Sequence, residues 1–341
     1  MANKRIFYAV QQAAFTKCGI EAYSSPDDKA VHGLQSLGIN TKFNLEQVFE
    51  IGQISIYQNI ENIPDVEITM EKVLDGYPLI YHLATHGATV PSLSGRANVK
   101  ATVGLSIFND TQDSASGTTI AQCQMSGVYV SSLAYNIQVQ GNATEQVTIV
   151  GNNKVWNNAF TTTSFDNDDA PLATEGVNRR QHIKFGASDP AGPVNSHLPQ
   201  DIPGITSSGT NELTNGEFGA HVQSIKVSAN LGREQLFELG RKGPFHRYVN
   251  FPVEVRCDIE VLSTAGDQVS ALEEASNLTD RKIFIWMTEG TKLDLGTKSK
   301  LASVNYGGAN AGQNGGNATV TYSYVTFNDL TVTHPEDPSA L

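Results

Sequence analysis

Two groups of side chains have types and spacings that could bind a metal ion. His82 and His86 are four residues apart, so two imidazoles could share one face of a helix. The acidic sequence FDNDDA (165–170) carries three aspartates that could coordinate calcium. The histidines lack a nearby carboxylate or cysteine pattern, and the acidic sequence lacks the glycine and distal glutamate of an EF-hand loop. We therefore predict surface or packing histidines, a solvated acidic linker and no metal site.

Repeated glutamates form the next candidate group. LEQVFEIG (45–52) and REQLFELG (233–240) each carry two glutamates four residues apart. Such carboxylates could do acid–base chemistry only if the two pairs faced each other in a cleft. Their repetition on an expected amphipathic helix favours a structural role, as ion pairs between neighbouring domains. The four candidates are Glu46, Glu50, Glu234 and Glu238.

The remaining reactive residues lack the surroundings that catalysis requires. GGANAGQNGG (307–316) has no following helix that could bind phosphate, so it predicts a flexible hairpin tip. Cys257 lies in an apolar, strand-like stretch and should be a small core residue. The chain has no nucleophile elbow, P-loop, dinucleotide fingerprint, zinc-protease motif or C-x-x-C pair. We expect a protein that is not an enzyme and uses no cofactor.

Length and composition limit the number of domains and the class of protein. The 341 residues suit about two domains, and 39% of them are hydrophobic, enough for ordinary cores. No apolar run approaches the roughly 18 residues of a membrane span. The N-terminus is expected to be a first strand, since two glutamines interrupt its apolar stretch. Three distant cysteines predict neither disulfides nor a zinc site, and favour folding in reducing conditions.

The charge balance argues against tight binding of nucleic acid. The chain has 23 basic and 35 acidic residues, a net charge of −12. Proteins that hold DNA tightly do so because lysine and arginine neutralise its phosphates. Contact with DNA without tight binding remains compatible with this charge.

The chain contains an internal duplication. Residues 34–52 align with residues 222–240, including a shared Gln-Ser pair and the two glutamate sequences. GNAT follows at 141–144 and again at 316–319, so the landmarks keep their order. The predicted division is a first β domain at 1–160, a polar linker with long loops at 161–215, and a second β domain at 216–341 whose start could reach back to about residue 175.

Each copy alternates apolar and polar residues, as half-buried strands do, and then changes to helical spacing for about two turns. We predict a mainly β fold: two tandem β-sandwich or barrel domains, each with a short flanking helix. In both copies a phenylalanine should plug the core, a glycine should end the helix and a proline should start the next strand. These residues are Phe49, Gly52, Pro64, Phe237, Gly240 and Pro252.

The order of strand, short helix ending in FE(I/L)G, proline and VEV-type strand resembles the tail tube proteins of tailed bacteriophages. The resemblance is carried by 231–261 and by 33–78, together about a quarter of the chain. It implies small β domains that form rings, usually with six domains, stacked into a hollow tube that conducts DNA during ejection. The implied location is the virion, after assembly in the host cytoplasm.

A chain with two such domains departs from the usual single-domain form. Three copies would give a ring with pseudo-sixfold symmetry, which we favour, and six copies with a double-layered ring are the alternative. The implied partners are other copies of the chain, a sheath if the tail contracts, a baseplate and a terminator, with DNA passing through the lumen and no membrane. Edge pairing would close each ring, and ring stacking would be open-ended.

Two other interpretations stay open. A single-ring terminator, neck or baseplate adaptor would have the same fold. A carbohydrate-binding or hydrolytic tail-fibre protein would need a concave cluster of tryptophan, tyrosine and carboxylates, whereas Trp156 and Trp286 are far apart in the sequence.

Overall fold

The computed structural model describes most of the chain. The described residues are 5–17, 29–109, 115, 119–157, 176–183, 198, 221–263, 266–267, 269–272, 278–308 and 316–338. The acidic sequence 165–170, most of the glycine-rich 307–316 and the predicted boundaries at 160, 175 and 215 lie outside these residues. Among the described residues, strands dominate, and the α-helices are the short α1 (Ile80–Ala84) and α2 (Leu93–Arg96). The predicted mainly β fold is confirmed.

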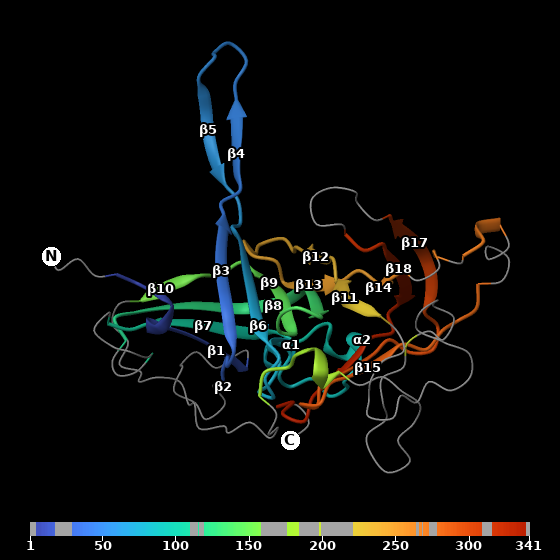
Figure 1. Cartoon of the computed structure of the whole chain (residues 1–341). Helices are drawn as coiled ribbons and strands as arrows, with labels where there is room; N and C mark the ends of the chain where they lie inside the picture. Colours follow the sequence, from blue (N-terminus) through green and yellow to red (C-terminus); the bar gives the residue numbers. More distant parts are fainter. Residues whose placement is uncertain are drawn as a thin grey trace.

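One long antiparallel sheet runs through both halves of the chain (Figure 1). Its order is β3 (Leu34–Lys42), β6 (Asp65–Val73), β9 (Thr144–Gly151), β8 (Ala121–Gln138), β11 (Val222–Asn230), β14 (Glu254–Leu262), β18 (Thr319–Phe327) and β17 (Lys300–Gly307). The first four strands come from the first half, and the last four come from the second. The halves join where β8 pairs with β11. Within the described part of the chain the sheet is open, with β3 and β17 at its two ends.

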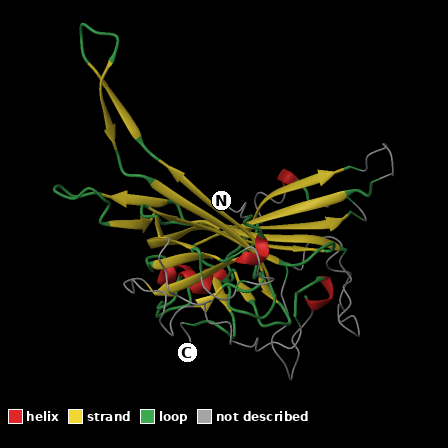
Figure 2. Ribbon diagram, turned by 90° about the vertical axis from the view of Figure 1, so that its left-hand side faces the viewer, coloured by secondary structure: helices red, strands yellow, loops and turns green. Residues whose placement is uncertain are grey.

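Two smaller sheets share the core of this long sheet. The first part of β8 also pairs with β7 (Ala101–Ile107) and β10 (Val155–Asn157); β7 continues to β1 (Gln11–Lys17) and β2 (Lys29–Ala30). In the second half, β16 (Lys292–Asp294) pairs with β15 (Phe284–Trp286) and β19 (Thr331–Thr333). A single hydrophobic core includes residues of all three sheets. Figure 2 shows the strands layered in this way, with little helix.

Alternation of side chains explains why the long sheet has one buried face. In β6, Val66, Ile68 and Met70 are buried at every second position, and polar residues separate them. Strand β14 repeats the pattern, and its Cys257 is fully buried. Burial raises the pKa of the Cys257 thiol well above its usual value, so the thiol stays protonated. The prediction of a core cysteine is confirmed.

The duplication extends to irregularities in the strands. The β3–β6 ladder shifts register between Leu34 and Ser36, and the β11–β14 ladder shifts between Val222 and Ser224, each 188 positions later. The β8–β9 ladder shifts between Val130 and Ser132, and the β17–β18 ladder does so between Leu301 and Ser303, each 171 positions later. Bulges re-aim a strand and are specific features of a fold. Both halves therefore contribute the same arrangement of four strands to the long sheet.

The two repeated glutamate sequences are strands and not helices, so this part of the prediction is wrong. β4 (Leu45–Phe49) pairs with β5 (Ile56–Glu61), and β12 (Arg233–Leu236) pairs with β13 (His246–Val249). Two turns of helix are too short to be stable without strong tertiary packing. In a hairpin, the backbone N–H and C=O groups of the first strand instead form hydrogen bonds with the strand that follows. A short helix does occur later in the first half, at α1.

The hairpins also change the expected roles of the repeated residues. Phe49 and Phe237 are 62% and 60% exposed, so they are not core plugs. Gly52 and Gly240 have positive φ, 105° and 85°, but they turn hairpins and do not end helices. The two prolines, Pro64 and Pro252, stand just before β6 and β14.

Candidate assembly interfaces

The two hairpins are alike in their pairing. Leu45 pairs with Glu61 across the first, and Arg233 pairs with Val249 across the second. The paired positions of the second hairpin all follow counterparts in the first by 188 residues. Their surroundings differ, because β12–β13 lies against the body and β4–β5 projects from it (Figure 1).

The β12–β13 hairpin docks on the strand ends of the first half. Arg247 Nη2 donates to Asp65 Oδ1 at 2.9 Å, and Gln235 Nε2 donates to the same oxygen at 3.2 Å. Arg233 Nε donates to the Val130 carbonyl at 2.7 Å. Arg247 Nε donates to Asn152 Oδ1 at 3.3 Å. This hairpin therefore forms polar contacts with β6, β8 and the end of β9.

Ring contacts reinforce the docking. The Arg233 guanidinium lies 5.1 Å from the centre of the Tyr129 ring, a cation–π distance. His246 meets the same ring edge-on at 5.2 Å and stacks on Tyr248 at 4.2 Å. Tyr129 of the first half thus contacts the hairpin twice, through a cation–π contact with Arg233 and a ring contact with His246.

Asp65 is the acceptor at the centre of this contact. Its partial burial would by itself raise the pKa of the carboxyl. Hydrogen bonds from Asn44, Arg247 and Gln235 outweigh that effect and hold the pKa of Asp65 below its usual value. The carboxylate therefore stays charged at neutral pH and remains paired with Arg247.

The β4–β5 hairpin exposes apolar residues on both strands and at its tip. Ile51 and Ile54 at the tip are fully exposed. The other exposed apolar residues along it are Phe43, Leu45, Phe49, Ile56, Tyr57 and Ile60. Figure 2 shows the hairpin standing clear of the sheets. A concentration of exposed apolar residues on one projecting element usually marks an interaction site.

The ends of the long sheet are a second candidate interface. Among the described residues, β3 pairs only with β6, and β17 pairs only with β18. An edge strand presents unpaired backbone groups that can pair with another chain. The β8–β11 junction shows how two halves pair, from Ser224 opposite Gln138 to Asn230 opposite Ser132. By the duplication, β3 corresponds to β11, and β17 corresponds to the second part of β8.

An open groove of about 690 Å³ separates the base of the first hairpin from the second hairpin. Asn44, Asp65, Arg233, Gln235 and Phe237 are among the residues that line it. Asp65, Arg233 and Gln235 are the residues that dock β12–β13. The groove is thus a part of the docking region, and Asp65 within it accepts hydrogen bonds from Asn44 and Gln235.

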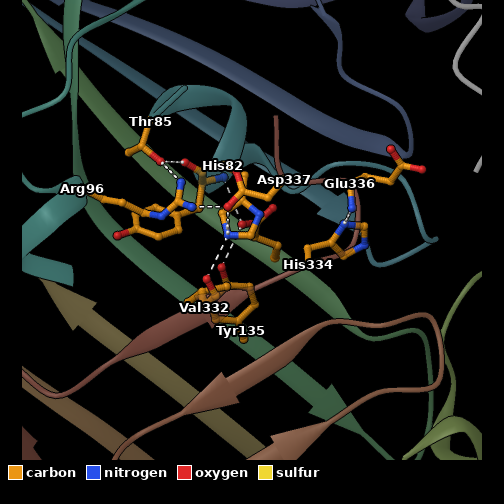
Figure 3. A network of polar contacts seen from close by, with 10 residues as sticks. His82, Thr85, Arg96, Tyr135, Val332, His334, Glu336 and Asp337 are labelled. Atoms are coloured by element: carbon orange, nitrogen blue, oxygen red, sulfur yellow. Dashed lines mark hydrogen bonds and ion pairs between the residues drawn. The ribbon is translucent and has the colours of Figure 1, made fainter. Parts of the chain in front are cut away.

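A buried polar network joins the end of the chain to the first half (Figure 3). Arg96 on α2 forms an ion pair with Asp337 and donates to Thr85 Oγ1 at 2.9 Å. His82 on α1 lies with Nε2 3.1 Å from the Val332 carbonyl on β19. Burial, aided by the charge of Arg96, lowers the pKa of His82 to about 4. His82 is therefore neutral and donates from Nε2, which makes it a packing histidine, as predicted.

Glu145 on β9 holds the start of α1 in place. Its carboxylate accepts hydrogen bonds from the Ile80 and Tyr81 backbone nitrogens at 2.6 and 3.1 Å. Tyr135 Oη donates to it at 3.0 Å. Burial raises the pKa of Glu145, and Lys72 and these hydrogen bonds oppose that rise. Sequence reasoning missed this residue, because a lone glutamate after the GNAT turn gives no sign of its partners.

The four predicted glutamates all lie on or beside the hairpins. Glu46 accepts from Asn62 at 3.4 Å, Glu50 accepts from Gln53 at 2.9 Å, and Glu238 pairs with Arg241 at 3.2 Å. Glu234 lies on β12, opposite Tyr248. These contacts are local. The ion pair that joins the two halves through the hairpin is instead Arg247 with Asp65.

Three further observations bear on function. No three His, Cys, Asp or Glu side chains in the described residues are placed to hold a metal ion. The described helices include none long and apolar enough to span a membrane. Trp156 lies on β10 and Trp286 on β15, which belong to different sheets.

A scan of protein-family models finds none that matches this chain, and no curated protein matches it. Solved structures with some similarity include a chain of the anti-feeding prophage baseplate, at 10% identity and a TM-score of 0.34, covering 46% of this chain and 97% of that one. A chain of the anti-feeding prophage tube-terminating cap has 13% identity and a TM-score of 0.34, covering 47% and 95%. A chain from the sheath–tube complex of an extracellular contractile injection system has 9% identity and a TM-score of 0.33, covering 46% and 95%.

Proposed function

We propose that this chain is a structural protein of a phage tail that forms rings from copies of itself and stacks them into a hollow tube. The observation that carries the proposal is the long sheet. It passes without interruption from one half to the other and ends in two strands that correspond to the pair already joined inside the chain.

The internal junction predicts the register between subunits. Val227 lies opposite Tyr135 in the β8–β11 ladder. Their counterparts are Ile39 on β3 and Tyr306 on β17. The same correspondence sets Asn40 opposite Asn305. Pairing in this register would continue the sheet from chain to chain, and closure of the ring would remove both edges of the long sheet.

Three chains per ring are favoured, because each chain supplies two equivalent sets of strands. A ring of three would then contain six such sets with pseudo-sixfold symmetry. Stacking of rings is a heterologous contact and can continue indefinitely. The net charge of −12 suits a channel that lets DNA pass without holding it, since phosphates bind tightly to basic surfaces.

The proposed register can be tested with Asn40 and Asn305, which are both exposed. The variant Asn40→Lys with Asn305→Lys places two like charges opposite each other at every seam, which opposes pairing. The variant Asn40→Lys with Asn305→Glu places opposite charges there. Negative-stain images and sedimentation of both should show fewer rings for the first and restored rings for the second.

Three outcomes of these measurements separate the alternatives. Rings that stack into filaments support the tube. Rings that never stack point to a terminator, neck or baseplate adaptor. A protein of 36.7 kDa that stays monomeric at every concentration would refute the proposal.

A further inference from the structure

We propose that the β4–β5 hairpin docks on the second half of a neighbouring copy of this chain, at the strand ends around Glu254 and Phe327. The inference rests on the proposed ring and adds to it a second, specific contact between subunits. It follows from the duplication, because the other hairpin already occupies the corresponding site within the chain.

The internal contact provides the template. β12–β13 extends from β11, and β11 pairs with β8 of the first half. The hairpin then reaches back over the same half, to Asp65 at the start of β6 and to the Val130 carbonyl on β8. Edge pairing and hairpin docking thus occur together, on one neighbour. A β3 strand paired to a β17 edge would carry its own hairpin to the same place on the second half.

Strand registers identify the residues that would meet. Asp65 corresponds to Glu254, because Ile68 pairs with Ile39 as Cys257 pairs with Val227. By the same ladders, Val130 corresponds to Leu301 and Asn152 corresponds to Phe327. On the hairpin, the counterparts of Arg233, Gln235 and Arg247 are Leu45, Gln47 and Asn59.

The differences between the two hairpins keep one polar contact and make the rest more apolar. Gln47 can donate to Glu254 as Gln235 donates to Asp65. Leu45 replaces Arg233 and would face the region of Leu301. Phe327, in place of Asn152, is 56% exposed, and Leu45 is 62% exposed, so both proposed surfaces present uncovered apolar groups. An apolar contact between chains explains why the first hairpin carries an exposed Leu45 on the face that corresponds to Arg233 and Gln235.

The occupant must be another copy and not the same chain. β3 and β17 stand at opposite ends of an eight-strand sheet. With about 4.8 Å between neighbouring strands, the two ends are roughly 34 Å apart. Figure 1 shows β3 with its hairpin and β17 on opposite sides of the molecule. The hairpin and β3 therefore cannot reach the β17 end of their own sheet while the sheet stays intact, and only another copy can pair there.

Disulfide trapping of assembled protein tests this contact. Two single variants, Gln47→Cys and Glu254→Cys, are made in a Cys18→Ser background, and the two other cysteines are buried. Assembled alone, each should remain monomeric on non-reducing gels. Assembled as an equal mixture under mild oxidation, they should give a disulfide-linked dimer, so the bond must join two chains. The double variant should give species up to the full ring.

A matched control uses the template contact. The variant Asp65→Cys with Gln235→Cys should form its disulfide within one chain and run as a monomer with altered mobility. It verifies the oxidation conditions on residues already in contact.

The outcomes distinguish the hairpin contact from ring assembly. Rings in negative stain without the cross-link between positions 47 and 254 would overturn the hairpin contact and leave the proposed function standing. A cross-link seen in stacked filaments but not in isolated rings would also overturn it, since the hairpin would then reach another ring. Absence of both rings and cross-link would overturn the two proposals together.

Discussion

The two hairpins differ in surroundings far more than in construction. The strands of β12–β13 pair in the register of β4–β5, yet only β12–β13 has a docking site within the described part of the chain. The docked hairpin carries Arg233 and Arg247, which bind a carboxylate, a carbonyl and an aromatic ring. The projecting hairpin carries Leu45 and Asn59 at the same positions. The comparison indicates that each hairpin forms from its own two strands, with or without a docking site. Docking depends in addition on the residues that the neighbouring surface presents.

The largest expected effect comes from removing the docked hairpin's main anchor. Arg247→Ala leaves Asp65 without its charged partner and removes a side chain that is only 6% exposed. We expect the free energy of unfolding to fall by about 1–3 kcal/mol, the usual range for losing hydrogen bonds to a charged group. Chemical denaturation measures this. The matched variant Asn59→Ala should change the monomer by less than about 0.5 kcal/mol, because that site is solvent-exposed in one chain. Equal losses in both variants would contradict the comparison.

Acid should release the docked hairpin and leave the projecting hairpin unchanged. The pKa of Asp65 is lowered in the folded chain, so its contribution to stability is complete above the ordinary aspartate pKa of about 4. That contribution is lost as the pH falls through the lower folded value. Hydrogen-exchange protection of β12–β13, corrected for intrinsic rates, should therefore fall below about pH 4. In Asp65→Asn, the protection of this hairpin should not change over the same range; a pH response that persists there would assign the effect to another group.

Giving the first hairpin the second hairpin's arginine should strengthen assembly. Asn59→Arg would face Glu254 of the neighbouring chain as Arg247 faces Asp65. An exposed ion pair contributes about 0.3–1 kcal/mol, so the concentration needed for ring formation should fall about twofold to fivefold. Sedimentation at several protein concentrations measures it, and added salt should reduce the gain. Asn59→Glu is the control and should raise the required concentration.

The smallest expected effect concerns the exposed phenylalanines. Phe237→Ala and Phe49→Ala should each lower the monomer's free energy of unfolding by less than about 1 kcal/mol, because both rings are mostly exposed. Thermal unfolding of the two variants checks this. A loss of about 3–5 kcal/mol, typical of a buried ring, would show that the rings pack in a core.

Much of the fold could be predicted from the sequence because alternation of apolar and polar residues marks the strands. The apolar residues of β6 and β14 recur at every second position and lie in the core. The duplication can be recognised because the repeated sequences occur in the same order in both halves, including the GNAT sequences at the starts of β9 and β18. The alternation predicts a mainly β fold. The duplication predicts that the two halves contain corresponding strands.

The hairpins could not be predicted correctly, for a physical reason. In LEQVFEIG the spacing of Leu45, Val48 and Phe49 fits a helix as well as a strand, and eight residues are too few to separate the periods. The strand that pairs with this sequence, β5, follows Gly52. Its apolar and polar residues do not alternate, so the sequence gives no sign of a strand there. The anchors Asp65 and Arg247 are 182 residues apart, so only the fold brings them together.

Imaging of the assembled protein by electron cryo-microscopy tests the central claim most directly, that copies of this chain close the long sheet by joining β17 to β3. The account predicts a hollow ring of three chains in which Asn305 lies opposite Asn40 of the next chain. A ring whose subunits meet elsewhere, with both strand edges left open, would contradict it.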